Sequence, residues 1–219
     1  MIPGKQRHGA LTVIRKKVQL QVLCAVASLI ALIGVCVTSH VAVAQPLQME
    51  CYPLDALTVD DEYFIGDSFE ATNATINITP YFRNGEAASP DNPSVQRAWV
   101  RSSMIAGGNA PELRAYLVNV QVVPDTPAQG VSMRYGRTGG TRFANLAVNG
   151  ELTEIDGSMT DVDNRVLGSP LQGRVLVRVT PDNTDHESGT IELFPLTGAI
   201  HRFAVGGVPH YLDDVCLTY

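Results

Sequence analysis

The sequence predicts an all-β fold, a jelly-roll-like antiparallel β-sandwich preceded by an amino-terminal apolar helix. Beyond the amino-terminal region, short runs alternate apolar and polar residues with a period of two, which is typical of half-buried strands. Turn residues rich in glycine and asparagine separate these runs. No stretch of ten or more residues in this part combines helical periodicity with capping residues.

The clearest alternating runs are residues 75–79, 114–124, 142–148, 174–180, 190–196, 199–205 and 208–219. Asn149-Gly150 joins two apolar stretches and is typical of a two-residue type I′ hairpin. One short turn of helix is expected at residues 109–115. Runs at this spacing indicate about eight to ten strands, arranged as a two-layer sandwich or a barrel.

Residues 1–44 are predicted to be a signal peptide or an amino-terminal membrane anchor, and residues 45–219 a single β-sandwich domain. A basic region precedes a 16-residue apolar run, and Ala-Val-Ala at 42–44 fits a cleavage site. A membrane-spanning helix needs about 20 apolar residues, which the run reaches only if it extends toward Ala44. Either way the domain is exported, periplasmic or extracellular, and an uncleaved helix would hold it in the inner membrane through residues 18–44 alone.

The exported part contains two cysteines, Cys51 and Cys216, one near each end. In an oxidising compartment such a pair is expected to form one disulfide, and two free buried thiols are the alternative. A disulfide requires the first and last segments to be neighbours, with alpha carbons about 5.5 Å apart. A disulfide between the first and last strands favours a jelly-roll sandwich, because the two ends of the chain often pair in that fold.

Charge and motifs argue against two classes of function. Residues 45–219 contain 22 carboxylates, 11 arginines and no lysine, which gives a net charge of −11. A nucleic-acid binder needs a basic face, so nucleic acid is excluded as a partner. The sequence contains no HExxH, GxSxG or glycine-rich phosphate-binding motif, so nothing in it predicts an enzyme.

The segment 206–216, GGVPHYLDDVC, resembles the GG…(W/Y)(I/L)DDV ending of an uncharacterised group of secreted bacterial β-sandwich proteins, which are jelly-roll and carbohydrate-binding-module-like. YFIGDSF at 63–69, TINITPYF at 75–82 and NLAVNGE at 145–151 are similar to the same group, and the resemblance covers about residues 50–219. Tyr211 departs from the group, which has a tryptophan there. The resemblance implies the fold, and it implies no activity.

Asp213 and Asp214 are the candidate metal ligands. The ending is similar to that of carbohydrate-binding jelly rolls, in which an acidic pair lies near a structural calcium. On a regular strand the two carboxylates point to opposite faces, so only one can face inward. A buried aspartate needs a cation or several hydrogen-bond donors, which calcium or an arginine partner would supply. The acidic segment 161–164 is expected to be a solvated turn rather than a calcium loop.

Aromatic residues are the candidate ligand-binding residues, because rings stack on the apolar faces of sugars. Trp99, the only tryptophan, shares its strand parity with Arg97 and Arg101. The other candidates are Tyr116, Tyr135 and Tyr211, with packing in the core as the alternative for all four. Core packing is expected for Phe69, Phe82, Phe143 and Phe203.

Two functions remain open from the sequence. The first is an exported, non-catalytic module that binds a glycan at the cell envelope or outside the cell, with structural calcium as the one cofactor considered. The second is a structural or interaction subunit of an envelope protein complex, tethered by the amino-terminal helix if that helix is retained. In the second case the aromatic residues would be interface anchors.

Overall fold

Two antiparallel sheets form the fold of this protein in a computed structural model, which describes residues 47–52, 54, 57–88, 93–108, 110–138, 143–184 and 187–219. The predicted signal peptide or anchor at residues 1–44 lies outside the described residues. Within the described part of the chain, no helix is long and apolar enough to cross a membrane. Residues Leu47–Tyr219 form one compact unit.

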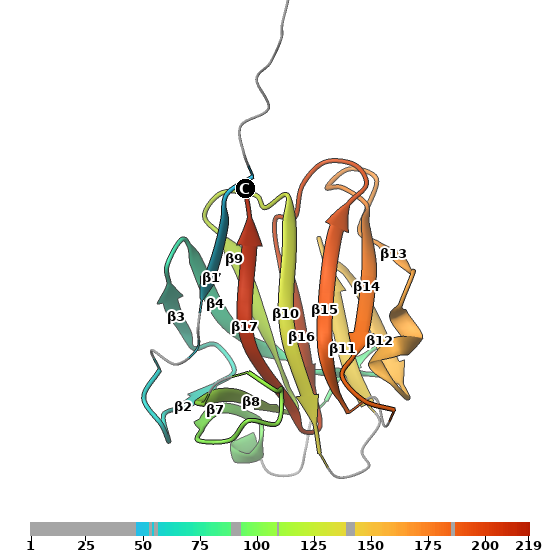
Figure 1. The fold of residues 1–219 in the computed structure, drawn as a ribbon. Coiled ribbons are helices and arrows are strands. Elements are labelled where there is room, and N and C mark those ends of the chain that lie inside the picture. Colours follow the sequence, from blue (N-terminus) through green and yellow to red (C-terminus); the bar gives the residue numbers. More distant parts are fainter. Residues whose placement is uncertain are drawn as a thin grey trace, which may run out of the picture. The chain divides into compact units, whose positions relative to one another are not determined.

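The larger sheet, here sheet A, has nine strands. In spatial order, eight of them are β13 (Val166–Leu167), β14 (Val175–Pro181), β15 (Ser188–Pro195), β10 (Gly130–Arg137), β17 (His210–Thr218), β8 (Glu112–Tyr116), β7 (Arg97–Arg101) and β2 (Glu62–Phe64). The ninth, β1 (Met49–Tyr52), pairs with the carboxy-terminal half of β17, beyond the part that pairs with β8. Figure 1 shows β1 beside β17 at the carboxy terminus.

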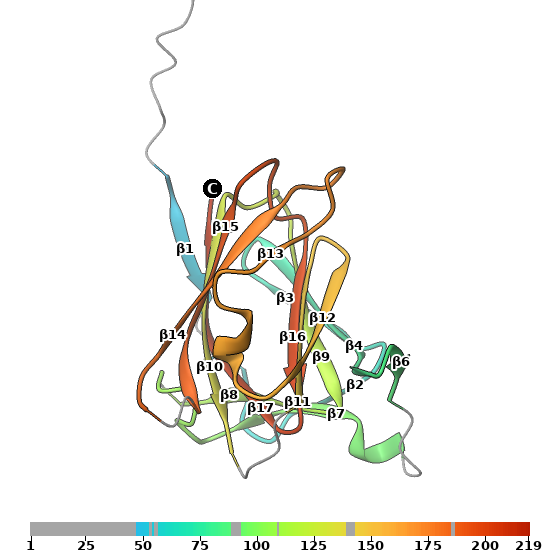
Figure 2. The ribbon, with the colours of Figure 1, turned by 90° about the vertical axis from the view of Figure 1, so that its right-hand side faces the viewer.

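The second sheet, sheet B, has six strands, and Figure 2 shows it edge-on against sheet A. Its spatial order is β12 (Glu151–Asp156), β11 (Phe143–Val148), β16 (Phe203–Gly207), β9 (Val118–Pro124), β4 (Ala74–Pro80) and β3 (Ser68–Ala71). A separate hairpin pairs β5 (Phe82–Arg83) with β6 (Glu86–Ala87). Two short 3-10 turns, η2 (Pro93–Val95) and η3 (Met159–Val162), lie between strands. The predicted all-β sandwich is therefore confirmed.

The core lies between the two sheets and is built from one side of each strand, as the alternation predicts. In β4 the side chains of Ile76 and Ile78 are buried while Thr75 and Asn77 lie on the other side. Apolar burial of this kind is the main force that holds two sheets together. The largest fully buried side chains include Tyr135, Phe203, Ile76, Leu113, Leu146 and Ile191.

Two predictions about local structure are corrected. Residues 112–115 belong to strand β8 and not to a helical turn, because Leu113 and Ala115 face the core while Arg114 faces outward. The run 114–124, which looks like one strand, is split between the sheets at Leu117, whose φ is +55°. Ala115 before this point and Val118 after it both face the core, so the parity of the pattern changes there.

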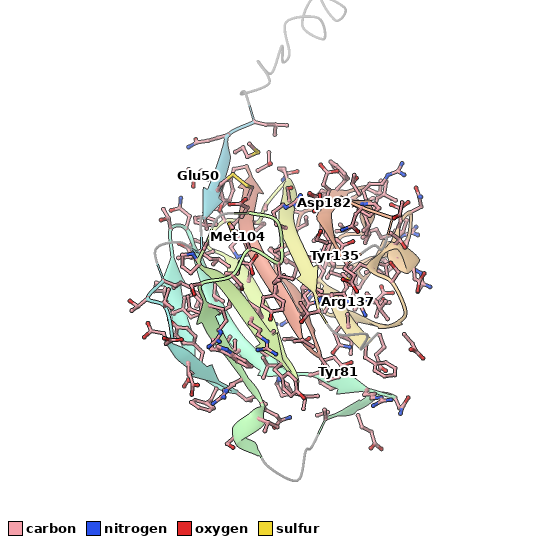
Figure 3. The ribbon with its side chains drawn as sticks, turned by 60° about the horizontal axis from the view of Figure 1, so that its bottom comes forward. Glu50, Tyr81, Met104, Tyr135, Arg137 and Asp182 are labelled. Carbon is pink, nitrogen blue, oxygen red and sulfur yellow. A yellow bond between two sulfur atoms is a disulfide. The ribbon has the colours of Figure 1, made fainter. Side chains whose placement is uncertain are left out.

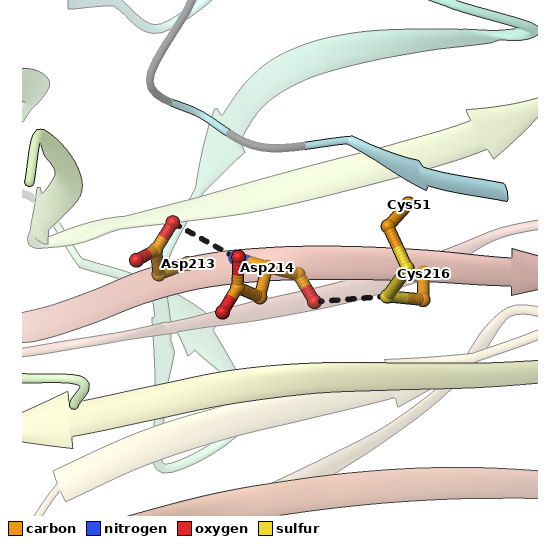
Figure 4. The surroundings of a disulfide bond; sticks show 4 residues. All are labelled: Cys51, Asp213, Asp214 and Cys216. Carbon is orange, nitrogen blue, oxygen red and sulfur yellow. Dashed lines mark hydrogen bonds between the residues drawn. A yellow bond between two sulfur atoms is a disulfide. The ribbon is translucent and has the colours of Figure 1, made fainter. Parts of the chain in front are cut away.

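The predicted disulfide joins Cys51 to Cys216, which are direct partners in the β1–β17 ladder. Their alpha carbons are 3.8 Å apart, closer than the sequence led us to expect. Figure 4 shows the bond between the first and last strands of the domain. A disulfide is compatible with an exported protein.

Candidate functional site

Three of the four candidate aromatic residues lie together on the outer side of sheet A. We call this surface the Trp99 face, and it consists of Glu62, Arg97, Trp99, Arg114, Tyr116 and Tyr211. Four of these residues form one row across the sheet, because Glu62 is opposite Trp99, Trp99 is opposite Arg114, and Arg114 is opposite Tyr211. Four strands, β2, β7, β8 and β17, thus contribute to one surface.

The alternation in β7 and β8 explains why these side chains face outward. Ala98 and Val100 enter the core, so Arg97 and Trp99 lie on the other side of β7. The same pattern in β8 places Arg114 and Tyr116 outward. The shared parity of Trp99 and its flanking arginines is as the sequence indicated.

Arginine side chains surround the Trp99 ring. The guanidinium carbons of Arg97 and Arg114 lie 4.9 and 4.5 Å from its centroid, and that of Arg114 also lies 5.5 Å from the centroid of Tyr211. The centroids of Trp99 and Tyr116 are 6.5 Å apart. These distances are within the range of cation–π attraction and of tilted aromatic pairs.

The two arginines differ in their charge partners. Arg97 Nη1 lies 2.9 Å from Glu62 Oε1 and forms an ion pair. No ion pair joins Arg114 to a carboxylate of a described residue, and its Nε is buried without a hydrogen-bond acceptor there. Among the described residues, Arg114 therefore holds an unpaired positive charge between the rings of Trp99 and Tyr211.

A loop covers the neighbouring part of sheet A and borders the Trp99 face. Buried Glu112 anchors this segment, residues 102–108, by accepting hydrogen bonds from Ser103 Oγ (2.8 Å) and from the Ala106 amide (2.6 Å). Arg134 Nε donates to the Ala106 carbonyl at 2.9 Å. The loop passes so close to Gly136 that a Cβ there would lie 2.5 Å from the Ile105 carbonyl.

Asp213 and Asp214 do not follow the simple alternation that the sequence suggested. The β10–β17 register shifts between Ser132 and Arg134, and Asp214 has a φ of +46°. Leu212, Val215 and Leu217 all face the core, so the strand gains one residue at the acidic pair, as in a β-bulge. The expectation that the two carboxylates point to opposite faces is therefore wrong.

The acidic pair lies under the 102–108 loop. Asp213 is fully buried, and its Oδ1 accepts a hydrogen bond of 2.8 Å from the Asp214 amide, which Figure 4 shows. A Cβ on Gly108 would collide with Asp213 Oδ2 and lie 3.1 Å from Asp214 Oδ2, so both carboxylates face the same part of the loop. Among the described residues no group of three or more His, Cys, Asp or Glu side chains is placed to hold a metal.

The acidic segment 161–164 uses its polar side chains for local hydrogen bonds. Asp161 completes the capping box of η3 with Ser158. Asp163 Oδ1 accepts from the Val179 amide at 2.9 Å, and Asn164 bonds to Arg178. This arrangement agrees with a structural turn.

The structure places Tyr135, the fourth aromatic candidate, inside the sandwich. It is completely buried and stacks on His210 with ring centroids 6.1 Å apart. Burial raises the pKa of Tyr135 to about 12 and lowers that of His210 to about 3, with the nearby charge of Arg137 as a smaller cause for His210. Figure 3 shows Tyr135 and Arg137 along β10. Tyr135 is thus a core residue and not a surface platform.

Sequence reasoning missed Arg114 as part of the site. Its parity with Tyr116 could have placed it outward, but only the β7–β8 register puts it opposite Trp99. Comparisons with protein-family models, curated proteins and solved structures find no match for this chain.

Proposed function

We propose that this protein is an exported, non-catalytic module that binds a glycan through the Trp99 face. The observation that carries the proposal is the clustering of the partly exposed Trp99 and Tyr116 with two arginines on the outer side of sheet A, where Tyr211, 7% exposed, lies beside Arg114. Rings contact the apolar faces of sugars, and guanidinium N–H groups donate to sugar hydroxyls. The jelly-roll-like topology and a structural calcium at Asp213 and Asp214 belong to the same proposal.

Arg114 is the residue that makes this surface suited to a polar ligand. Its guanidinium lies beside Trp99 and Tyr211, and no carboxylate of a described residue neutralises it. A ligand that stacks on Trp99 would meet guanidinium N–H groups for which no described residue supplies an acceptor. The resemblance of segment 206–216 to carbohydrate-binding jelly rolls supports the same ligand class.

A second candidate function is docking to a protein of the cell envelope. It is favoured by one observation, namely that the guanidiniums of Arg97 and Arg114 already lie over the Trp99 ring. Tryptophan and arginine are enriched at the centres of protein interfaces. Phe64, beside this face in β2, is 42% exposed and would extend such an interface.

The two functions are separated by a glycan array run beside a native pull-down from membranes. Glycan binding predicts a micromolar signal that Trp99→Ala abolishes and that Phe194→Ala leaves unchanged. Phe194 is a matched control, because it is 43% exposed in β15 of the same sheet, away from the Trp99 face. An empty array together with stoichiometric recovery of an envelope complex would refute glycan binding and favour docking.

A further inference from the structure

A hollow of about 410 Å³ lies on the outer side of sheet B, the sheet that does not carry the Trp99 face. We call it the sheet B groove. Its floor is formed by Ala147 in β11 and Ala204 in β16, which are direct partners in the ladder. Gln121 in β9 and Leu152 in β12 continue the same row on either side. Two alanines between longer side chains make the middle of the sheet surface low.

The hairpin β5–β6 closes one end of the groove. Asn145, fully buried, holds it there, because its Oδ1 accepts from the Phe82 amide (2.8 Å) and its Nδ2 donates to the Phe82 carbonyl (3.0 Å). Glu154 accepts from the amides of Asn84 (2.6 Å) and Gly85 (2.7 Å). Figure 2 shows this hairpin on the outer side of sheet B. Phe82, expected in the core, instead lines the groove.

The polar groups of the groove are mostly neutral and partly unused. The side-chain amide of Gln121 makes no hydrogen bond to another described residue. Thr79 and Arg202 add further donors to the lining. Asn119 is 3% exposed, and its Oδ1 has no donor among the described residues. Its Nδ2 is held by the Pro80 carbonyl at 2.8 Å, so the amide is fixed at the groove floor with one acceptor unsatisfied. No carboxylate belongs to the described lining.

We infer that the sheet B groove is a second ligand site that binds a sugar residue of a neutral saccharide. Its volume falls within the range of about 300–1,000 Å³ that is usual for small-ligand sites. Phe82 supplies an apolar ring, and the partly exposed Gln121 supplies a side-chain amide of the kind that hydroxyl-rich ligands need. Asn119 also lines the groove, and its unsatisfied Oδ1 is buried there. This site is independent of the Trp99 face, with which it shares no residue.

The groove is tested by filling it. Ala147→Phe places a ring on its floor without entering the core, because Ala147 faces outward between the core residues Leu146 and Val148. Thr75→Phe is the matched control, since Thr75 faces outward in β4 of the same sheet but does not line the groove. Gln121→Ala is a milder variant that leaves the groove open and removes one amide.

The probes are cellopentaose, xylopentaose and mannopentaose, titrated into the purified exported protein and followed by calorimetry and amide chemical shifts. At least one probe is expected to bind, with Kd raised tenfold or more by Ala147→Phe and about tenfold by Gln121→Ala, which corresponds to one hydrogen bond. Thr75→Phe and Trp99→Ala should leave that Kd unchanged. Absence of binding by any probe at about 10 mM would overturn the inference. Binding that Trp99→Ala abolishes and Ala147→Phe spares would also overturn it, while supporting the Trp99 face.

Discussion

Reduction of the Cys51–Cys216 disulfide should destabilise the domain strongly without unfolding it. The bond closes a loop with a sequence separation of 165 residues. The chain-entropy model gives about 5 kcal/mol for a loop of this length, as an upper figure. The β1–β17 ladder still pairs Met49–Tyr52 with Val215–Thr218 after reduction, so the loss arises mainly in the unfolded state. For a domain of this size it corresponds to a fall in Tm of about 10–20 °C.

Urea unfolding followed by circular dichroism, with and without a thiol reductant, measures this effect. The reduced protein should keep its β-rich spectrum, unfold at a lower urea concentration and show a larger m-value, because its unfolded chain is less compact. A variant with both cysteines replaced by serine serves as the control, since reductant should not shift its midpoint further. Equal midpoints for the oxidised and reduced proteins would refute the loop-entropy argument.

Three further predictions follow from buried or paired polar groups. Asn145→Leu should lower the free energy of unfolding by about 2–4 kcal/mol, because the Phe82 amide and carbonyl both lose their hydrogen-bond partner. It should also speed proteolysis of the β5–β6 hairpin. Equal cleavage rates for the variant and the unmodified protein would contradict this role. Burial lowers the pKa of His210 to about 3, so the unfolded state binds the extra proton between about pH 6.5 and 3. The free energy of unfolding should therefore decrease as the pH is lowered across that window. His210→Phe should flatten the dependence of the urea midpoint on pH. If calcium binds at Asp213 and Asp214, chelation should lower the Tm of the native protein by several degrees and leave that of Asp213→Asn unchanged. An unchanged Tm of the native protein on chelation would rule the site out.

The sequence predicted the strands and one hairpin well because these depend on local patterns. Asn149-Gly150 connects β11 to β12, and both residues have positive φ, +50° and +86°, as a type I′ turn requires. The pairing of the two cysteines followed from their number in residues 45–219. Each of these inferences needs only residues that are close in sequence, or the number of cysteines.

Two of the errors came from positions where the period of two is interrupted. At Leu117 the chain passes from sheet A to sheet B, and at Asp214 a bulge adds one residue to β17. The core residues are odd-numbered before Leu117 and even-numbered after it. At Asp214 they change from even-numbered to odd-numbered. A single inserted residue reverses every later assignment to a face, and the sequence carries no clear mark of it.

Within an uninterrupted strand, the sequence by itself determined which side chains share a face, as for Arg97 and Trp99 in β7 or Asn119 and Gln121 in β9. Only the tertiary structure decided which outward residues become neighbours. The row of Glu62, Trp99, Arg114 and Tyr211 comes from four strands, and the floor of the sheet B groove joins Ala147 to Ala204. Strand order and register are fixed by how the inner faces of the two sheets fit together, so the outer surfaces result from packing on the opposite side of the same strands.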